Sequence, residues 1–511
     1  MIDLDDNTLD TYEDKYQSQS HSPSIYRHLY GEILTPLSFV KTMISHIPNN
    51  IWEDMTNVWI DPGSGRGSIS IYIYYKLMFH LENSIPDLGE RKTHIVTKML
   101  VMVDINECNV IHLRSIFGNK ANIYHGDFLS HDVQKQILTH NPSVVICNPP
   151  FHHKHKIKVP TNRHIDKVCD GEAIWVPFVK ASVQLLRDAG IAVFIIPSLW
   201  CKLDKKGCYT FLTYTPEICI EHVTFYSNTE TNAIFNKQAQ TPTTLIQLRK
   251  IINKQETTVD NVCNINVHDK INNSVVLFPL YTHCKRALPS NGVRIIRSIQ
   301  AKMTAHRVES LRSFTKKTNM PSKQCLFNDN VSPSSDYPYA NIHSCIVRGS
   351  LTDAPLLTMQ FSNIPLPYSN DIKIILAHKM YGVPFYDKDG KYGISNRDNY
   401  VIRFPEQLIN MKNQENDIQL SNGDIYDLYT HLFKLPCIQF LLTCTTYRMR
   451  CIEIYAFDYI PCVHLLPGFP NIHTMTNKSV MRYFEFTKSE EEYVNNHHSK
   501  GVYQKTPTLA Y

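Results

Sequence analysis

Four short segments in the first part of the chain that can form strands each end at a polar residue. Asp61, Asp104 and Asp127 follow the first three segments, and Asn148 follows the fourth. Apolar runs of this length, bounded by turn residues, indicate buried strands. Because strands that alternate with helices build a mainly parallel sheet, the four polar residues are expected along its carboxyl edge, where ligands bind. The sequence therefore predicts an α/β fold with its site at that edge.

The first of these strands leads into a glycine-rich turn. Residues 61–67 have the sequence Asp-Pro-Gly-Ser-Gly-Arg-Gly and stand between the apolar run 58–60 and a helix expected over 68–77. Glycines at alternate positions let the backbone turn tightly and approach a ligand closely. Their spacing is G-x-G-x-G, which differs from the dinucleotide-binding G-x-G-x-x-G pattern.

The next two strand ends carry groups suited to a nucleoside. Asp104 can accept hydrogen bonds from both hydroxyls of a ribose. Asp127 can accept a hydrogen bond from an adenine amino group while Phe128 packs on the ring. Each acid taken alone could instead cap a helix. Their order along the chain, with an Asn-Pro-Pro-Phe loop after the fourth strand, favours a shared ligand site.

The loop Asn148-Pro149-Pro150-Phe151 combines two rigid acceptors with an aromatic face. The prolines restrict the backbone, and the Asn148 side chain and the Pro149 carbonyl each offer an oxygen. Two such acceptors can hold both hydrogens of a 6-amino group and stabilise the charge that develops on its nitrogen during methyl transfer. Phe151 can stack on the base. This chemistry requires no metal and no covalent intermediate.

The order of these motifs resembles that of S-adenosylmethionine-dependent methyltransferases that modify amino groups. The segment Gly31-Glu32-Ile33-Leu34-Thr35-Pro36 resembles the Gly-Glu-x-x-Thr-Pro segment of gamma-class adenine-specific DNA methyltransferases. The resemblance implies a Rossmann-like catalytic domain over 25–254, with a mixed, mostly parallel seven-stranded sheet. A mixed α+β target-recognition domain is expected over 255–511, and an acidic, flexible tail over 1–24.

The resemblance also implies roles for individual residues. The catalytic residues are Asn148, Pro149, Pro150 and Phe151. The residues expected to bind S-adenosylmethionine are Thr35, Pro36, Asp61, Gly63, Gly65, Gly67, Asp104, Ile105, Asp127 and Phe128.

A duplex hides the adenine amine within the base stack, so the base must be flipped into the site. Phe151 and Phe235 are expected to hold the flipped base between them, although Phe235 is equally compatible with packing in the core. Basic residues expected to contact DNA phosphates lie in the loop after the catalytic motif and in the target-recognition domain; for each one, an ordinary solvated surface position is the alternative. They are Lys154, Lys156, Lys373, Lys379, Lys391 and Arg397.

Composition limits the remaining possibilities. The chain has 511 residues, a net charge of +5 and 14 cysteines without a C-x-x-C pair. This pattern indicates a reducing compartment inside the cell and gives no reason to expect a bound metal. No apolar run is long enough to cross a membrane. Double-stranded DNA is the expected partner, a restriction endonuclease is a possible one, and monomer and dimer remain open. An RNA adenine methyltransferase and a non-catalytic nucleic-acid-binding subunit are the alternatives.

Overall fold

The computed structural model describes residues 31–151, 173–203, 208–251, 262–281, 287–322, 325–328, 332–346, 355–378, 384–405, 422–447 and 451–499. The tail 1–24 and the predicted DNA contacts Lys154, Lys156 and Lys379 lie outside these residues. The chain divides into two compact units: Met1–His268 with Leu277–Lys285, and Asp269–Val276 with Arg286–Tyr511.

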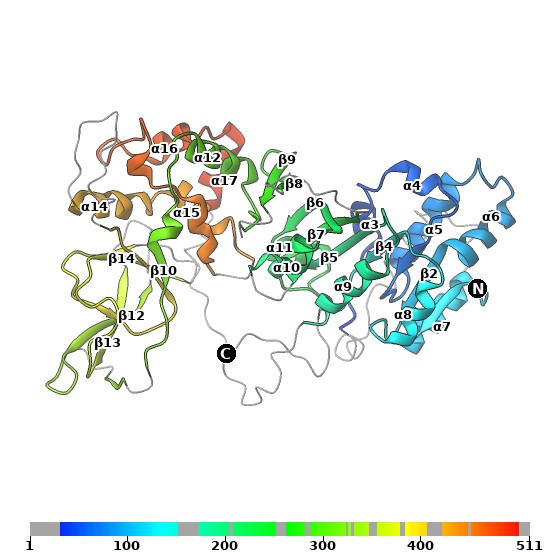
Figure 1. The fold of residues 1–511 in the computed structure, drawn as a ribbon, viewed down its shortest axis with the longest axis horizontal. Coiled ribbons are helices and arrows are strands. Elements are labelled where there is room, and N and C mark those ends of the chain that lie inside the picture. Colours follow the sequence, from blue (N-terminus) through cyan, green and yellow to red (C-terminus); the bar gives the residue numbers. More distant parts are fainter. Residues whose placement is uncertain are drawn as a thin grey trace. The chain divides into compact units, whose positions relative to one another are not determined.

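A single large sheet organises the first unit (Figure 1). Its strand order is β3-β2-β1-β4-β5-β7-β6-β8-β9. The strands are β1 (Trp59–Asp61), β2 (Leu100–Asp104), β3 (Asn122–His125), β4 (Val144–Cys147), β5 (Ile191–Pro197), β6 (Ile218–Tyr226), β7 (Thr243–Lys250), β8 (Val262–Asp269) and β9 (Ser274–Tyr281). Strands β1 to β5 pair in parallel, and β7 runs antiparallel to both of its neighbours.

The predicted seven-stranded sheet corresponds to β1–β7, and the sheet has two strands more. Strand β8 pairs in parallel with β6, with His222 opposite Asn266, and β9 follows it at the edge. The sequence analysis assigns residues 255–511, and with them these strands, to the following domain, because pairing between distant segments leaves no local signal. The fold class itself is confirmed as a Rossmann-like, mostly parallel α/β sheet of the kind found in methyltransferases.

Both faces of the sheet are covered, as is usual for a mostly parallel sheet. Every residue of β2, β4 and β5 is buried, whereas a strand with one solvated face would alternate. One apolar cluster joins α3, α5 and α7 to the strands. The helices of this unit are α3 (Leu37–Met43), α4 (Asn49–Glu53), α5 (Ser68–His80), α6 (Leu88–His94), α7 (Glu107–Phe117), α8 (His131–Leu138), α9 (Trp175–Leu185), α10 (Cys208–Tyr214) and α11 (Asn228–Ile234).

The second unit mixes helices with two small sheets, as an α+β domain does. The sheet orders are β10-β17-β14-β15 and β11-β13-β12-β16. Its strands are β10 (Thr315–Lys317), β11 (Phe327–Asn328), β12 (Tyr339–Ile346), β13 (Leu356–Ser362), β14 (Lys373–Ala377), β15 (Phe385–Asp387), β16 (Gly393–Ile394) and β17 (Asn399–Ile402). Its helices are α12 (Val293–Ala305), α14 (Asn422–Leu432), α15 (Pro436–Thr443), α16 (Asn477–Tyr483) and α17 (Lys488–Ser499).

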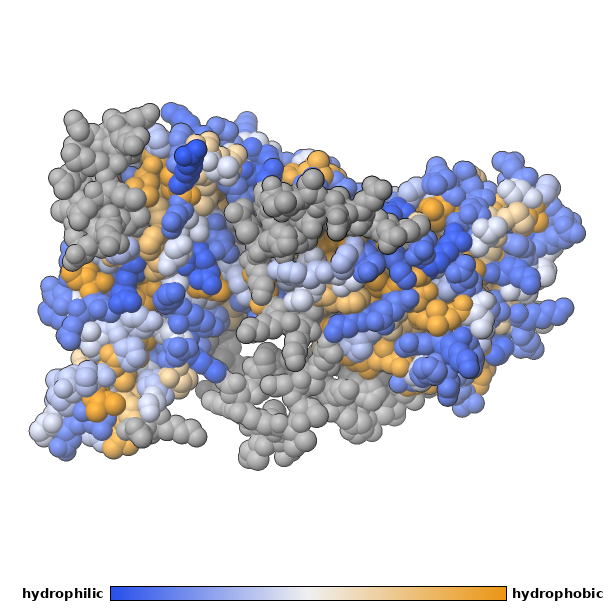
Figure 2. All heavy atoms as spheres, viewed as in Figure 1, coloured by the Kyte–Doolittle hydropathy of each residue, from blue (hydrophilic) through white to orange (hydrophobic). Residues whose placement is uncertain are grey.

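Hydrophilic residues cover much of the described surface in view, with apolar residues in scattered patches between them (Figure 2). Within the described ranges, no helix combines the length and the apolar character needed to cross a bilayer.

Candidate active site

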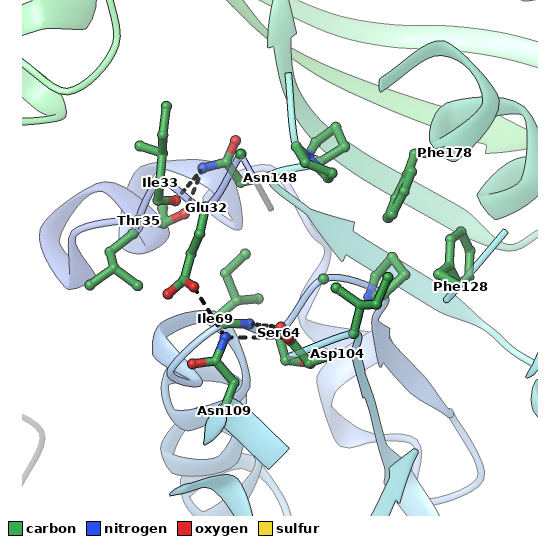
Figure 3. A pocket seen from close by; sticks show the side chains of 18 of the residues that line it. Glu32, Ile33, Thr35, Ser64, Ile69, Asp104, Asn109, Phe128, Asn148 and Phe178 are labelled. Atoms are coloured by element: carbon green, nitrogen blue, oxygen red, sulfur yellow. Dashed lines mark hydrogen bonds between the residues drawn. The ribbon is translucent and has the colours of Figure 1, made fainter. Parts of the chain in front are cut away.

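A pocket opens at the carboxyl ends of β1 to β4 (Figure 3). The lining comes from the stretch before α3, the glycine-rich turn, the ends of β2 and β3, and the Asn-Pro-Pro-Phe loop, together with residues of α5, of α7 and of the start of α9. The lining residues are Gly31, Glu32, Ile33, Leu34, Thr35, Pro62, Gly63, Ser64, Gly65, Ser68, Ile69, Asp104, Ile105, Asn109, Gly126, Asp127, Phe128, Asn148, Pro149, Pro150, Phe151, Ile174 and Phe178. Motifs that are distant in the sequence therefore meet in one pocket, and three of the four residues named by the strand-end argument, Asp104, Asp127 and Asn148, line it.

The glycine-rich turn takes a shape that side chains would oppose. Gly67 has φ 89°, and a Cβ atom there would lie 2.8 Å from a methyl carbon of Leu113. The turn is also bonded to β2, because Ser64 N donates to Val103 O (3.0 Å) and Val103 N donates to Ser64 Oγ (3.2 Å). The backbone of Gly63 and Gly65 thereby forms one wall of the pocket.

Asp104 connects the second strand to this turn. One of its oxygens accepts from Gly65 N (2.7 Å), and the other accepts from Asn106 N (2.8 Å) and from the Asn109 side chain (3.2 Å). Burial raises the pKa of Asp104 despite these hydrogen bonds. A carboxylate has about four lone-pair directions, so Asp104 keeps capacity for a ligand donor.

Asp61 lies behind the pocket. Its side chain is buried, and one oxygen accepts from Ser70 Oγ (3.0 Å). Burial is the largest cause that raises the pKa of Asp61 to about 7, and the charge of Asp104 adds to it. Three of the residues predicted to bind the cofactor do not line the pocket: Pro36, Asp61 and Gly67. They could affect a bound ligand only indirectly, by positioning the residues that do line it.

An apolar wall stands on another side of the pocket. The rings of Phe128 and Phe178 are 5.1 Å apart and tilted by 40°. Ile105 lines the same pocket and is partly exposed, at 43% of its surface. The carboxylate of Asp127 accepts from Leu129 N (2.9 Å), which fixes the turn after β3. A flat heterocycle fits against this kind of wall.

The Asn148 side chain is held by the segment before α3. Its amide nitrogen donates to Ile33 O (3.2 Å) and to Thr35 Oγ1 (3.1 Å) (Figure 3). These bonds fix the plane of the amide and leave its oxygen as an acceptor. Pro149, Pro150 and Phe151 line the pocket beside it.

Two predicted side chains do not lie where the sequence analysis expected them. Phe235 is 2% exposed and packs in the core against Phe39, with ring centroids 5.7 Å apart, so it does not face a base in this structure. Lys373 is fully buried and donates to Asp387 (2.5 Å), so it does not reach a phosphate. In both cases a long-range contact, invisible in the sequence, determines the orientation.

Lys391 differs from Lys373. Its side chain is 65% exposed and pairs with Asp389 at 2.8 Å. Arg397 also belongs to the second unit. The predicted contact of these two side chains with DNA phosphates therefore remains a proposal.

The sequence analysis missed several residues of the pocket. Glu32 was quoted only as part of a motif, although its carboxylate enters the pocket. Asn109 and Phe178 lie on helices, where the sequence does not show which side of the helix faces a ligand. Phe178 could have been found from the apolar stripe of α9, and Asn109 had no such signal.

The fold and the pocket define a class of protein. The strand order, the glycine-rich turn, a carboxyl at the end of β2 and an amide at the end of β4 are those of a nucleoside-binding methyltransferase fold. The donor set suits S-adenosylmethionine, because the pocket joins an aromatic wall to three carboxyl groups, those of Glu32, Asp104 and Asp127.

A comparison with protein families agrees with this class. Residues 103–229 match the Eco57I restriction-modification methylase family, and this segment includes Asp104, Asp127 and the Asn-Pro-Pro-Phe loop. The match confirms the predicted relationship to restriction-modification methyltransferases, with S-adenosylmethionine as the cofactor. Among curated proteins, none matches the chain significantly.

Solved structures with a distant similarity include methyltransferases and restriction enzymes. The M protein of the type I restriction enzyme EcoKI is 14% identical, with a TM-score of 0.35 over 48% of this chain and 50% of that one. A putative class I S-adenosylmethionine-dependent methyltransferase from Listeria monocytogenes is 13% identical, with a TM-score of 0.33 over 52% and 75%. The type IIG restriction endonuclease BpuSI is 11% identical, with a TM-score of 0.42 over 94% and 63%. The chain spans about half the length of the EcoKI protein.

Proposed function

We propose that the chain is a site-specific DNA methyltransferase that methylates the 6-amino group of a flipped adenine. The observation that carries this proposal is the anchored Asn148 amide. Its nitrogen is occupied by Ile33 and Thr35, at 3.2 and 3.1 Å, so its oxygen is the group available to accept from an amine. The Pro149 carbonyl, beside it in the pocket lining, supplies the second acceptor.

Some pocket residues would bind the cofactor, and others would position the amine that receives the methyl group. Asp104 would accept from ribose hydroxyls, and Phe128 with Phe178 would pack on the purine of the cofactor. S-adenosylmethionine supplies a methyl group activated by a sulfonium. Asn148 and Pro149 would hold both amine hydrogens and orient the nitrogen toward that methyl. Their dipoles would stabilise the positive charge that develops on the nitrogen, and Phe151 would fix the plane of the base.

The second unit would select the DNA sequence. It is large enough to form a recognition domain, and exposed Lys391 illustrates the kind of side chain that contacts phosphates. Duplex DNA is the proposed substrate and partner. A restriction endonuclease that cleaves the unmethylated site is a second proposed partner, in keeping with the family match.

Transfer of labelled methyl from S-adenosylmethionine to duplex DNA, RNA and protein tests the proposal. We expect label in duplex DNA, on adenine N6, and sequencing of methylated bases should show one recurring site. Asn148→Ala should lower the rate by about 100-fold or more, as the loss of a preorganised acceptor does. The matched control is Asn119→Ala, at an exposed position outside the pocket.

Three results would contradict the proposal in different ways. Label in RNA alone would indicate an RNA methyltransferase. DNA binding without transfer to any substrate would indicate a non-catalytic subunit. Full activity of Asn148→Ala would remove the assigned catalytic role.

A further inference from the structure

The β12–β13 hairpin of the second unit presents two different faces (Figure 1). On one face, Ile342 and Cys345 are 0% and 1% exposed and belong to the core. On the other face, Leu356 and Thr358 alternate along β13, and both are exposed. Residues directly opposite each other in an antiparallel pair share a face, so Ser344, which pairs with Thr358, lies there too. This outward face of the hairpin is accessible to a partner.

A β-bulge adds a histidine to the outward face. Ile342 and Ser344 pair with consecutive residues of β13, so His343 is the extra residue between them. A bulge of this kind changes the direction in which a side chain points. His343 Nδ1 lies 2.9 Å from Oε1 of Gln360, which follows Thr358 at the next outward position of β13. The bulge therefore places an imidazole among the outward side chains.

Hydrogen bonds join this imidazole to two amides. Because an amide oxygen can only accept, His343 Nδ1 donates to Gln360 Oε1. His343 Nε2 accepts from the side-chain nitrogen of Asn396 (3.2 Å), and Asn396 Oδ1 accepts from the backbone nitrogen of Asp398 (3.3 Å). These bonds fix the planes of both amides within the protein. A side chain that is already ordered loses little conformational entropy when it binds a partner.

Cationic side chains stand close to this network in the chain and in the sheet. Asn396 follows β16, which pairs with β12, and exposed Lys391 and Arg397 stand shortly before and after β16. Thr318 Oγ1 donates to Asn396 O (2.6 Å), which links the network to β10, whose last two residues are exposed lysines. Cations beside uncharged hydrogen-bonding side chains suit DNA, because cations bind phosphates and the uncharged groups bind base edges.

The width of the hairpin also suits DNA. Strand β16 pairs with β12 at Asn341 and Ile342, whereas the stretch Ser344–Ile346 pairs with β13. Among the described strands, this stretch is therefore a two-stranded ribbon. The major groove of B-DNA is about 12 Å wide and admits a two-stranded ribbon, and all four base pairs present distinct donor and acceptor patterns there.

We infer that the outward face of the β12–β13 hairpin binds base edges in the major groove of the methylated site. Thr358, His343 and Gln360 would be its specificity-determining residues. This inference rests on the proposed function, which gives sequence selection to the second unit as a whole, and assigns that selection to one face of one hairpin. The surrounding cations would bind phosphates and set the position of the hairpin along the duplex.

Methylation of a panel of duplexes by the full chain tests the inference. The panel contains the site that the wild type methylates and duplexes that each differ from it at one base pair. The variants are Thr358→Ala, at an exposed position, and Gln360→Ala, which removes one partner of His343. The matched control is Thr304→Ala, at an exposed position of α12. Lys391→Ala serves as a comparison, because it removes a proposed phosphate contact.

We expect each hairpin variant to lower the preference for the wild-type site over one singly changed duplex by about tenfold or more. Affinity for unrelated DNA should stay as in the wild type, because the phosphate contacts remain. Lys391→Ala should instead weaken binding to all sequences alike, with a shallower dependence on salt. Thr304→Ala should match the wild type in every measurement.

An unchanged site preference in both hairpin variants would overturn the inference. An equal loss on every duplex would also overturn it, since the hairpin would then contribute only to stability or to phosphate binding. If Gln360→Ala does not fold, the exposed Thr358→Ala variant decides the result by itself. A wild type that does not methylate duplex DNA would overturn the proposed function. If the wild type methylates one recurring site and both variants keep it, only the role of the hairpin fails.

Discussion

The side-chain nitrogen of Asn148 donates a hydrogen bond to Thr35 Oγ1 across 3.1 Å, between residues that are 113 positions apart in the sequence. Thr35 is 5% exposed, so water does not readily replace it. The bond joins the segment before α3 to the loop after β4, and it determines which edge of the amide stays free.

Thr35→Val should reduce the turnover number for methylation about fivefold to tenfold, because one anchoring hydrogen bond of the amide is lost. The affinity for S-adenosylmethionine, measured by calorimetry, should change less than the turnover number. Thr35→Ser keeps the hydroxyl and should restore most of the rate. A Thr35→Val enzyme with unchanged turnover would show that Ile33 alone holds the amide.

Asp61 should make the stability of the first unit depend on pH. Its folded-state pKa is raised from 3.8 to about 7, mainly by burial, so the folded protein binds more protons than the unfolded chain between these pH values. The stabilisation is fully present below about pH 4 and is lost as pH rises through 7, with a slope of at most about 1.4 kcal/mol per pH unit.

Asp61→Asn should flatten that slope when denaturant unfolding is followed between pH 4 and 7. Some slope should remain, because the pKa values of Glu32 and Asp104 are also raised by burial. Asp132→Asn, at a side chain that is 94% exposed, is the control and should leave the profile unchanged. An identical profile for Asp61→Asn would mean that the pKa of Asp61 is not raised in the folded state.

Phe235 should behave as a core residue. Phe235→Ala should lower the free energy of unfolding by about 3–5 kcal/mol, the usual cost of truncating a buried aromatic. Phe235→Leu keeps most of the volume and should retain both stability and DNA methylation. If Phe235→Leu instead folds normally but loses methylation of duplex DNA, the original base-stacking prediction would be restored.

Substitution of Lys373 should affect stability, whereas substitution of Lys391 should affect DNA binding, although both lysines belong to the second unit. Lys373→Met leaves Asp387 buried without its cation and should destabilise the unit by about 3–5 kcal/mol. Lys391→Ala should leave unfolding unchanged and weaken DNA binding, with a shallower dependence on salt. Thermal unfolding and DNA binding at several salt concentrations check both. If the Lys373→Met protein is as stable as the wild type but binds DNA more weakly, Lys373 would be a DNA contact and not a structural residue.

The parallel part of the fold could be predicted from the sequence because its signals are local. Strand β5 occupies the continuous apolar run Ile191–Pro197, and helix α9 begins at Trp175, which places Pro177 in the first turn, where a proline is tolerated. The gathering of Asp104, Asp127 and Asn148 in one pocket followed from the geometry of parallel strands alone.

The remaining features depend on contacts between distant segments. The addition of β8 and β9 to the sheet depends on the pairing of His222 with Asn266. The buried state of Lys373 depends on Asp387, which stands on the neighbouring strand. An alternating pattern shows that a strand exists, but it does not show which strand lies beside it or which polar side chain turns inward.

The hydrogen bond from Gly65 to Asp104, at 2.7 Å, is made within the protein itself. The glycine turn is therefore ordered when the protein folds, before any ligand binds. The conformational entropy of its glycines is lost in folding and not in binding. An incoming nucleoside meets a rigid surface, and no ordering of this loop subtracts from its affinity. Amide hydrogen exchange at Gly65 should accordingly be slow both with and without the donor.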